Sequence, residues 1–222
     1  MTNILGIFAK QPIAGQVKTR LAAATSPAFA AQVAEAMLRD TLLRLATIDA
    51  ERWLVFAPAD AGPAMAELAG PRYQLAPQGD GDLGRRMQRF FERHVRTDHD
   101  RAVLVGADSP SLPVEYVRQA LADLQHAEVV LGPATDGGYY LIGCARSMPP
   151  IFDGIAWGGP TVLRDTIGRL AASTCLALLP PWYDVDTFAD WRVLQGHVAA
   201  LRRTGVDPGL SHVEHVSDFV AE

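Results

Sequence analysis

Short apolar runs alternate with helical patterns along nearly the whole chain, and this alternation is the strongest constraint on its fold. The apolar runs have the length of strands and cover residues 4–9, 52–57, 73–76, 102–105, 129–131, 139–144 and 175–179. Segments with a helical pattern lie between or after them, at residues 27–48, 64–68, 83–94, 113–124, 161–171 and 188–203. Strands that alternate with helices predict a mainly parallel sheet with helices on both of its faces.

The chain has the size and composition of a single α/β domain. Its 222 residues are 49% hydrophobic and 20% charged, which is typical of a globular protein with a substantial core. No internal repeat, low-complexity segment or long linker divides it. We therefore expect one domain over residues 1–204, followed by a polar C-terminal extension over residues 205–222 that forms a short helix or a loose tail.

Charge and hydropathy exclude several classes of function. The net charge of −5 argues against nucleic acid or an anionic membrane as a partner. No apolar run approaches the roughly 20 residues that cross a bilayer, and the first residues lack the basic region of a signal peptide. Cys144 and Cys175 lie in apolar runs, so free buried thiols are expected rather than a disulfide. A cytoplasmic location is the resulting expectation.

A carboxylate follows the most apolar central run. Residues 102–105 read as a strand that is buried on both faces; the run stops at Gly106, and Asp108 follows two residues later. Open parallel sheets bind ligands at the carboxyl ends of their strands. An Asp-Ser pair before Pro110 could also begin a turn or a helix. We favour a ligand-binding role for Asp108, since a plain core strand does not require an acid there.

Lysine is rare in this chain, and both lysines lie in one loop. Of the 20 basic residues 18 are arginine, and the two lysines are Lys10 and Lys18. With Arg20 they lie between the first expected strand and a helix, where backbone amides and the helix dipole favour anions. A compact ammonium group is suited to phosphate. Chance clustering of two lysines is the alternative interpretation.

Two common phosphate motifs do not account for this loop. A P-loop requires Gly-x4-Gly-Lys-Ser/Thr, but only two residues separate Gly15 from Lys18, and no earlier glycine is correctly placed. A dinucleotide fingerprint requires three spaced glycines after the first strand, where only Gly15 is present. The loop is therefore predicted to bind phosphates by another scheme.

Several further loops carry candidate functional groups. The run Asp136-Gly137-Gly138-Tyr139 could bind acceptor hydroxyls, because paired glycines let a ligand approach the backbone closely; a simple glycine turn is the alternative. Trp157 could line a pocket or pack on the core. The stretch 184–187, Asp-Val-Asp-Thr, could hold a metal or cap the following helix. Asp80 and Asp82 are expected to be turn or cap residues.

Five motifs, in order along the chain, resemble the DUF2064 family of glycosyltransferases linked to arsenosugar biosynthesis. They are Phe8-Ala9-Lys10-x-Pro12-x-x-Gly15-x-Val17-Lys18-Thr19-Arg20-Leu21, Gln78-Gly79-x-Gly81-Asp82-Leu83-Gly84 with Arg86-Met87, Gly106-Ala107-Asp108-Ser109-Pro110-x-Leu112, Gly132-Pro133-Ala134-x-Asp136-Gly137-Gly138-Tyr139-Tyr140 and Asp184-Val185-Asp186-Thr187. More distantly, the chain is similar to the guanylyltransferases for phospholactate and for molybdenum cofactor. The resemblance implies a three-layer α/β/α GT-A-like fold, the nucleotide-diphospho-sugar transferase fold, with a mainly parallel central sheet.

The resemblance also implies roles for individual residues. It implies that the nucleotide and its phosphates are held by Phe8, Ala9, Lys10, Gly15, Lys18 and Arg20, and that the base is bordered by Gln78, Gly79 and Gly81. It implies Mg²⁺ (or Mn²⁺) on Asp108, completed by Asp186 or Asp184. Mg²⁺ commonly takes one or two carboxylates together with phosphate oxygens.

Three hypotheses about function remain open at this point. The first is a Mg²⁺-dependent glycosyltransferase that moves a sugar from a nucleotide-sugar to a small acceptor, with Lys10, Lys18, Arg20 and Asp108 stabilising the leaving diphosphate and Asp136 as the candidate base. The second is a nucleotidyltransferase that joins a nucleoside triphosphate to a phosphorylated small molecule and releases pyrophosphate. Gly106 stands where many GT-A enzymes have the first acid of Asp-x-Asp, which favours the second. The third is a non-catalytic nucleotide-binding protein.

Overall fold

Seven strands form one sheet in the computed structural model, which describes residues 2–146, 149–217 and 219. The strand order is β3-β2-β1-β4-β6-β5-β7. The bounds of the strands are β1 Thr2–Lys10, β2 Glu51–Ala57, β3 Gln74–Pro77, β4 Asp100–Gly106, β5 Val129–Pro133, β6 Tyr139–Ala145 and β7 Leu176–Leu178. All neighbouring strands pair in parallel except β6, which is antiparallel to both β4 and β5.

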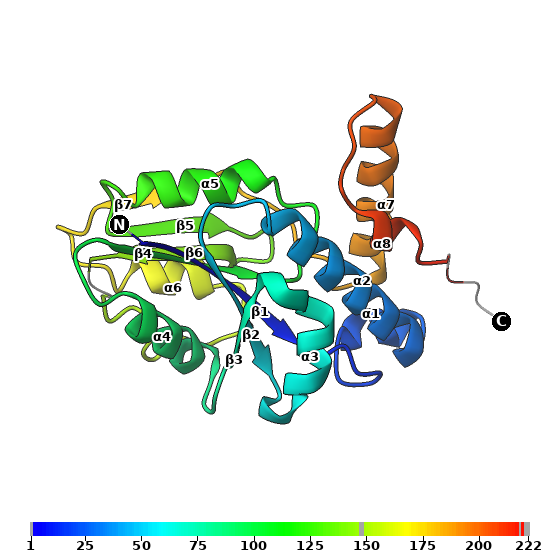
Figure 1. Ribbon diagram of the computed structural model, residues 1–222, viewed down its shortest axis with the longest axis horizontal. Helices are drawn as coiled ribbons and strands as arrows, with labels where there is room; N and C mark the ends of the chain where they lie inside the picture. The colour runs from blue at the N-terminus through cyan, green and yellow to red at the C-terminus, as the bar shows by residue number, and fades with distance from the viewer. Residues whose placement is uncertain (1, 147–148, 218, 220–222) are drawn as a thin grey trace.

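Helices cover both faces of this sheet. One face packs against α2 (Pro27–Leu45), α3 (Gly62–Ala69) and α5 (Val114–Asp123), with Leu5, Leu54 and Val103 in the shared core. The opposite face packs against α4 (Leu83–His94) and α6 (Val162–Ile167). Figure 1 shows α5 on one side of the strands and α4 and α6 on the other. The predicted three-layer α/β/α architecture with a mainly parallel sheet is therefore confirmed.

A third cluster of buried residues lies beyond the carboxyl end of β1. It joins α1 (Thr19–Ala24), the N-terminal half of α2, α7 (Phe188–Arg203) and α8 (Ser211–Glu214) around fully buried Trp191. Phe29 meets the ring of Trp191 edge-on, with a centroid distance of 6.1 Å. Helix α2 thus takes part in two cores, because its C-terminal half packs on the sheet through Leu38, Leu42 and Leu45.

The structure corrects several expectations from the sequence. Helix α1 was not expected, and α2 ends at Leu45 rather than at residue 48. Two short 3-10 helices, η1 (Ala59–Ala61) and η2 (Gly70–Arg72), flank α3. Cys144 is a buried free thiol as predicted, but Cys175 is exposed, because it directly precedes the edge strand β7.

Part of the expected C-terminal extension is a docked helix rather than a loose tail. Asp40 of α2 is fully buried, and its carboxylate accepts hydrogen bonds from the backbone amides of His212 and Val213, at 3.1 and 2.8 Å. Residues 218 and 220–222 of the extension lie outside the described residues. Within the described part of the chain, no helix is both long enough and apolar enough to span a membrane.

Candidate functional site

A cavity of about 710 Å³ opens at the edge of the sheet where the parallel strands end. Loops after β1, β3, β4 and β5 surround it, and the antiparallel β6 begins there. Most residues that the sequence singled out line this cavity: Phe8, Ala9, Lys10, Lys18, Arg20, Gln78, Gly81, Asp108, Asp136, Gly138, Tyr139, Trp157, Asp184 and Asp186. The topology therefore brings the phosphate loop, the strand-end acid and the two later loops to one place.

Three of the singled-out glycines are not in the cavity wall. Gly15, Gly79 and Gly137 have φ angles of 81°, 76° and 93°, respectively, in the left-handed region that favours glycine. They shape the loops that carry their neighbours instead of contacting the cavity. Their contact with a ligand stays a prediction.

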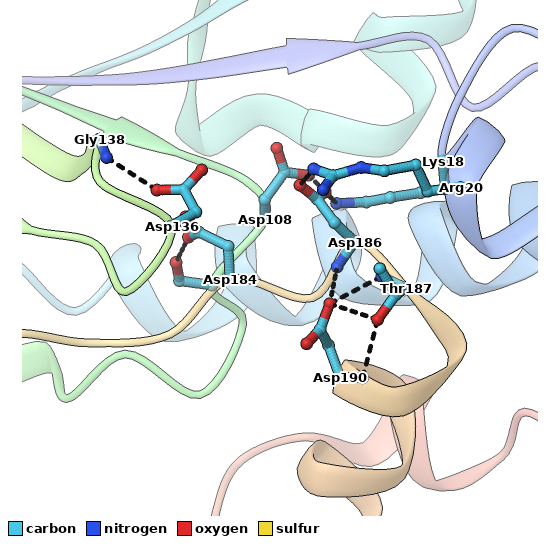
Figure 2. Close-up of polar contacts among 10 residues, drawn as sticks. Lys18, Arg20, Asp108, Asp136, Gly138, Asp184, Asp186, Thr187 and Asp190 are labelled. Atoms are coloured by element: carbon cyan, nitrogen blue, oxygen red, sulfur yellow. Dashed lines mark hydrogen bonds and ion pairs between the residues drawn. The ribbon is translucent and has the colours of Figure 1, made fainter. Parts of the chain in front are cut away.

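Lys18 joins the two acids that were expected to bind metal. Its ammonium donates to Asp108 Oδ1, in a close contact, and to Asp186 Oδ1 at 2.9 Å. Arg20 Nη2 donates to the other oxygen of Asp186. Figure 2 shows Lys18 and Arg20 reaching from one side toward Asp186 and Asp108. Two cations and two carboxylates thus form a continuous network in the cavity.

The environment of Lys18 differs sharply from that of Lys10. The Lys18 side chain is only 7% exposed, whereas Lys10 is exposed and makes no ion pair with any described residue. Burial alone would lower the pKa of the Lys18 ammonium, but Asp108 and Asp186 outweigh it and hold that pKa above its usual value. Lys18 is therefore a permanently charged group inside the cavity.

The loop that carries Asp186 is fixed by backbone bonds and by a helix cap. The amide of Val185 donates to the carbonyl of Asp108 at 2.9 Å, so the two acidic loops run side by side. Thr187 caps α7, and its side chain exchanges hydrogen bonds with Asp190. The sequence left metal binding and capping open for this stretch; the structure assigns the cap to Thr187. The carboxylate of Asp186 remains directed at the two cations.

Asp184 has a different environment from Asp186. Its Oδ1 accepts a close hydrogen bond from the hydroxyl of Ser109. Burial raises the pKa of Asp184 to about 6, an effect that the Ser109 bond opposes and that nearby Asp108, Asp136 and Asp186 reinforce. Asp108 and Asp186 thus share one ammonium, whereas Asp184 faces Ser109.

The carboxylates have the chemistry of a divalent cation site but not its arrangement. Asp108, Asp184 and Asp186 supply the oxygen ligands that Mg²⁺ prefers. Yet among the described residues no three His, Cys, Asp or Glu side chains are grouped closely enough to hold a metal ion. The ammonium of Lys18 lies between Asp108 and Asp186 instead. The donor set fits the metal, provided that Lys18 moves.

The opposite wall of the cavity holds the groups expected to meet an acceptor. Asp136 Oδ1 accepts from the amide of Gly138 at 2.8 Å, which is the turn that the sequence offered as the alternative to acceptor binding. Tyr139 and Trp157 meet edge-on with a centroid distance of 6.5 Å. Trp157 also packs on Phe152, so it serves both as cavity wall and as part of the core.

Arg86 lines the cavity near the expected position of the nucleobase, and no role was predicted for it from the sequence. It contacts Gln78, which was expected to border the base. Gln78 is buried, and its amide nitrogen donates to the carbonyls of Ala9 and Val55, at 3.2 and 3.1 Å. Arg86 donates to the Gln78 side-chain oxygen at 3.2 Å and itself lines the cavity. Arg86 belongs to the second sequence motif and lies one helical turn after the cap residue Asp82. This position was the sequence feature from which a role for Arg86 could have been predicted. Asp82 is a cap residue as predicted.

Solved structures of other proteins share this architecture. A protein of Desulfovibrio desulfuricans G20, described as a candidate nucleotide-diphospho-sugar transferase, is 35% identical, with 96% of this chain and 95% of that chain covered and a TM-score of 0.84. The inositol-1-phosphate CTP transferase of T. maritima is 14% identical, with 93% and 98% covered and a TM-score of 0.55. The 4-diphosphocytidyl-2C-methyl-D-erythritol synthase of Anaerococcus prevotii DSM 20548 is 9% identical, with 89% and 96% covered and a TM-score of 0.59.

The fold is therefore that of the nucleotide-diphospho-sugar transferases, as the sequence predicted. Residues 41–159, more than half of the 222-residue chain, match the family described as "Uncharacterized protein conserved in bacteria (DUF2064)". The protein belongs to the DUF2064 family. No curated protein matches the sequence. The 35% identical relative is named as a transferase, in agreement with the class expected from the sequence.

Proposed function

We propose that the protein is a metal-dependent transferase that moves a sugar from a nucleotide-sugar to a small acceptor. The observation that carries this proposal is the meeting of Lys18, Asp108 and Asp186 in one cavity at the carboxyl edge of the sheet. Cations that bind phosphate and acids that bind metal are the two requirements of diphosphate departure. The name of the 35% identical relative supports the same class of substrate.

The side chains divide the reaction between two walls of the cavity. Lys10, Lys18 and Arg20 would hold the diphosphate, while Asp136 and Tyr139 on the opposite wall would orient an acceptor hydroxyl. Mg²⁺ or Mn²⁺ held by Asp108 and Asp186 would neutralise the negative charge that develops on the departing diphosphate. The acceptor oxygen attacks the anomeric carbon, and Asp136 would take its proton. Positioning supplies much of the acceleration, and no covalent nucleophile is needed.

Nucleotidyl transfer is the second candidate, and the number of cations in the cavity supports it. Lys10, Lys18, Arg20 and Arg86 line the cavity beside five aspartates, and these four cations suit the phosphates of a triphosphate. Gly106 also stands in place of the first acid of Asp-x-Asp. In this reaction a phosphorylated acceptor would attack the α-phosphate of a nucleoside triphosphate, and pyrophosphate would leave.

The products distinguish the candidates. The protein would be incubated with Mg²⁺ and a broad acceptor panel, once with nucleotide-sugars and once with nucleoside triphosphates. Sugar transfer releases a nucleoside diphosphate, whereas nucleotidyl transfer releases pyrophosphate. Nucleotide binding without either product across the panel would support the non-catalytic alternative and contradict both enzymatic candidates.

Asp108→Asn tests the metal assignment common to both reactions. Loss of the charge should reduce metal-dependent turnover by at least about a hundredfold, as removal of a group that stabilises developing charge commonly does. Asp98→Asn is the matched control, because Asp98 is exposed in the loop before β4, at the other end of that strand. Unchanged turnover in Asp108→Asn would show that Asp108 does not hold the metal.

A further inference from the structure

Lys18 is placed where a divalent cation would have to bind. Its ammonium contacts one oxygen of Asp108 and one of Asp186, and these are the two carboxylates that the proposed function gives to the metal. The side chain is almost fully buried, with only 7% of its surface exposed. Figure 2 shows the Lys18 side chain directed to this pair of acids.

The backbone of Lys18 is held in a conformation that side chains rarely adopt. Lys18 has φ 46° and ψ 46°, in the left-handed region, and it immediately precedes α1. A non-glycine residue in this region is strained and persists only when its surroundings enforce it. The carbonyl of Lys18 accepts a hydrogen bond from the amide of Ala22 at 2.8 Å. The strained residue therefore also makes the first backbone hydrogen bond of the helix. The lysine is therefore fixed toward the acids at a cost in backbone energy.

We infer that Lys18 is a tethered cation that occupies the metal position when no nucleotide is bound, and that a divalent ion must displace it. This inference rests on the proposed function, because it takes Asp108 and Asp186 as the metal ligands. One ammonium and one divalent ion compete for the same carboxylate oxygens. A released ammonium is then available to the phosphates of a nucleotide bound in the same cavity.

Competition of this kind couples the binding of the metal to the binding of the nucleotide. A phosphate that draws Lys18 away leaves two carboxylates without their countercation, and a metal that replaces Lys18 frees it for phosphate. Each ligand thus raises the affinity of the other, and by thermodynamic linkage the two factors are equal. In the absence of nucleotide, Lys18 holds the affinity for metal down.

The first experiment uses the unmodified protein and exploits its two lysines. Protein labelled with ¹³C only in lysine gives side-chain signals from Lys10 and Lys18 alone, and a Lys10→Met variant assigns them. Titration with Mg²⁺ should shift the Lys18 Cε signal in a saturable way and move the Lys10 signal much less. A Lys18 signal that stays unchanged while Mn²⁺ binding to the same protein saturates would overturn the inference.

The second experiment measures metal affinity without nucleotide. Free Mn²⁺ would be followed by electron paramagnetic resonance for the wild type, Lys18→Met and Arg203→Met. Removal of the competing charge should tighten Mn²⁺ binding in Lys18→Met by at least about fivefold, the lower end of common coupling factors. Arg203 is an exposed cation of α7 outside the cavity lining, so Arg203→Met should bind Mn²⁺ as the wild type does. Equal or weaker binding in Lys18→Met would contradict the inference.

A third arm separates this inference from the proposed function. The Mn²⁺ titrations would be repeated with ADP, CDP, GDP and UDP present. Binding of Mn²⁺ to the wild type with a nucleotide, but no gain in Lys18→Met without one, overturns the inference alone. Absence of Mn²⁺ binding from every protein in both conditions overturns the inference and the metal part of the proposed function together.

Discussion

Gly137 and Gly15 share a left-handed backbone but differ in what surrounds them. Their φ angles are 93° and 81°. A Cβ built on Gly137 would lie 2.1 Å from the carbonyl oxygen of Pro160, whereas nothing lies within 4 Å of a Cβ on Gly15. The Gly137 carbonyl also accepts the amide of Leu163 at 2.9 Å, which ties the loop between β5 and β6 to α6. Glycine is thus required at residue 137 for two reasons and at residue 15 for one.

This contrast gives a prediction on stability. Gly137→Ala should lower the free energy of unfolding by about 3 kcal/mol or more, because steric overlap with backbone adds to the conformational strain. Gly15→Ala should cost about 1 kcal/mol from strain alone. Urea denaturation followed by circular dichroism measures both. Equal losses in the two variants would show that the approach of Pro160 to Gly137 carries no penalty.

Asp136 combines a structural bond with a proposed chemical role, and two substitutions separate them. Asn keeps a side-chain oxygen that can accept the amide of Gly138, whereas Ala cannot. Asp136→Asn should keep the melting temperature of the wild type but lower kcat/KM for the acceptor by about a hundredfold, if the carboxylate takes the acceptor proton. Asp136→Ala should lower both. Full activity in Asp136→Asn would remove Asp136 from the catalytic residues and leave it as a turn residue.

At the level of elements, one buried carboxylate fixes the C-terminal helix. Asp40 accepts both backbone amides at the start of α8, and His212 Nδ1 also lies 2.7 Å from its Oδ1. A carboxylate at a helix N-terminus satisfies amides that have no partner within the helix. The docking of α8 on α2 therefore combines a fully buried carboxylate with the apolar packing of Val213 in the third cluster.

Asp40→Ala should detach α8 from α2. We expect a loss of about 3 kcal/mol in the free energy of unfolding, because the buried amides of residues 212 and 213 would lose their partners. Hydrogen exchange at these two amides should become fast in the variant. Asp49→Ala is the control, since Asp49 is exposed after the same helix, and its cost should stay within about 0.5 kcal/mol. Persistent protection of residues 212 and 213 in Asp40→Ala would contradict this account.

The elements show what sequence patterns determine and what they do not. Apolar runs identified all seven strands within a few residues. In the central strands the reason is burial on both faces, which leaves a continuous hydrophobic signature. The antiparallel direction of β6 could not be predicted, since such a run is equally apolar in either direction. Helix α1 is six residues long, too short for a periodic pattern, and it was taken as part of the loop.

The site was predicted in its composition and not in its internal contacts. The rule that ligands bind at the carboxyl ends of strands collected most candidates into one cavity, because it depends only on topology. The bond of Lys18 to both acids depends on a left-handed backbone and on side-chain packing. The sequence gives phosphate and metal as separate roles for these residues, and their direct contact is known only from the structure.

Across the whole molecule, the stability should fall in mild acid because of His94. The ring lies 4.8 Å from the rings of both Trp53 and Phe90, measured between centroids. Burial, with help from Arg93 and Arg96, lowers the pKa of His94 to about 4 from an ordinary 6.5. His94 is therefore protonated near pH 6.5 in the unfolded chain but only near pH 4 in the folded protein. Stability is present above pH 6.5 and is lost as the pH falls toward 4.

His94→Phe isolates this contribution. Between pH 7 and pH 4.5 the free energy of unfolding should fall by about 1–2 kcal/mol more in the wild type than in the variant. This figure allows for solvent around the half-buried ring. Asp184 acts in the opposite sense, because its raised pKa favours the folded state as the pH falls through 6, so the two proteins are compared at each pH. Urea denaturation at a series of pH values measures the difference. Parallel pH profiles for both proteins would exclude His94 as the cause.

The division of α2 between two cores has a consequence for synthesis on the ribosome. Its N-terminal half is covered by Trp191 and its neighbours on α7, which emerge long after α2 itself. Until then Phe29, Val33 and Met37 form an uncovered apolar stripe on the nascent chain. The central strand β1 also lacks its partner β4 until that strand has been synthesised. Such intermediates attract other apolar surfaces. Translation that stalls before α7 should therefore yield chaperone-bound or aggregated chains.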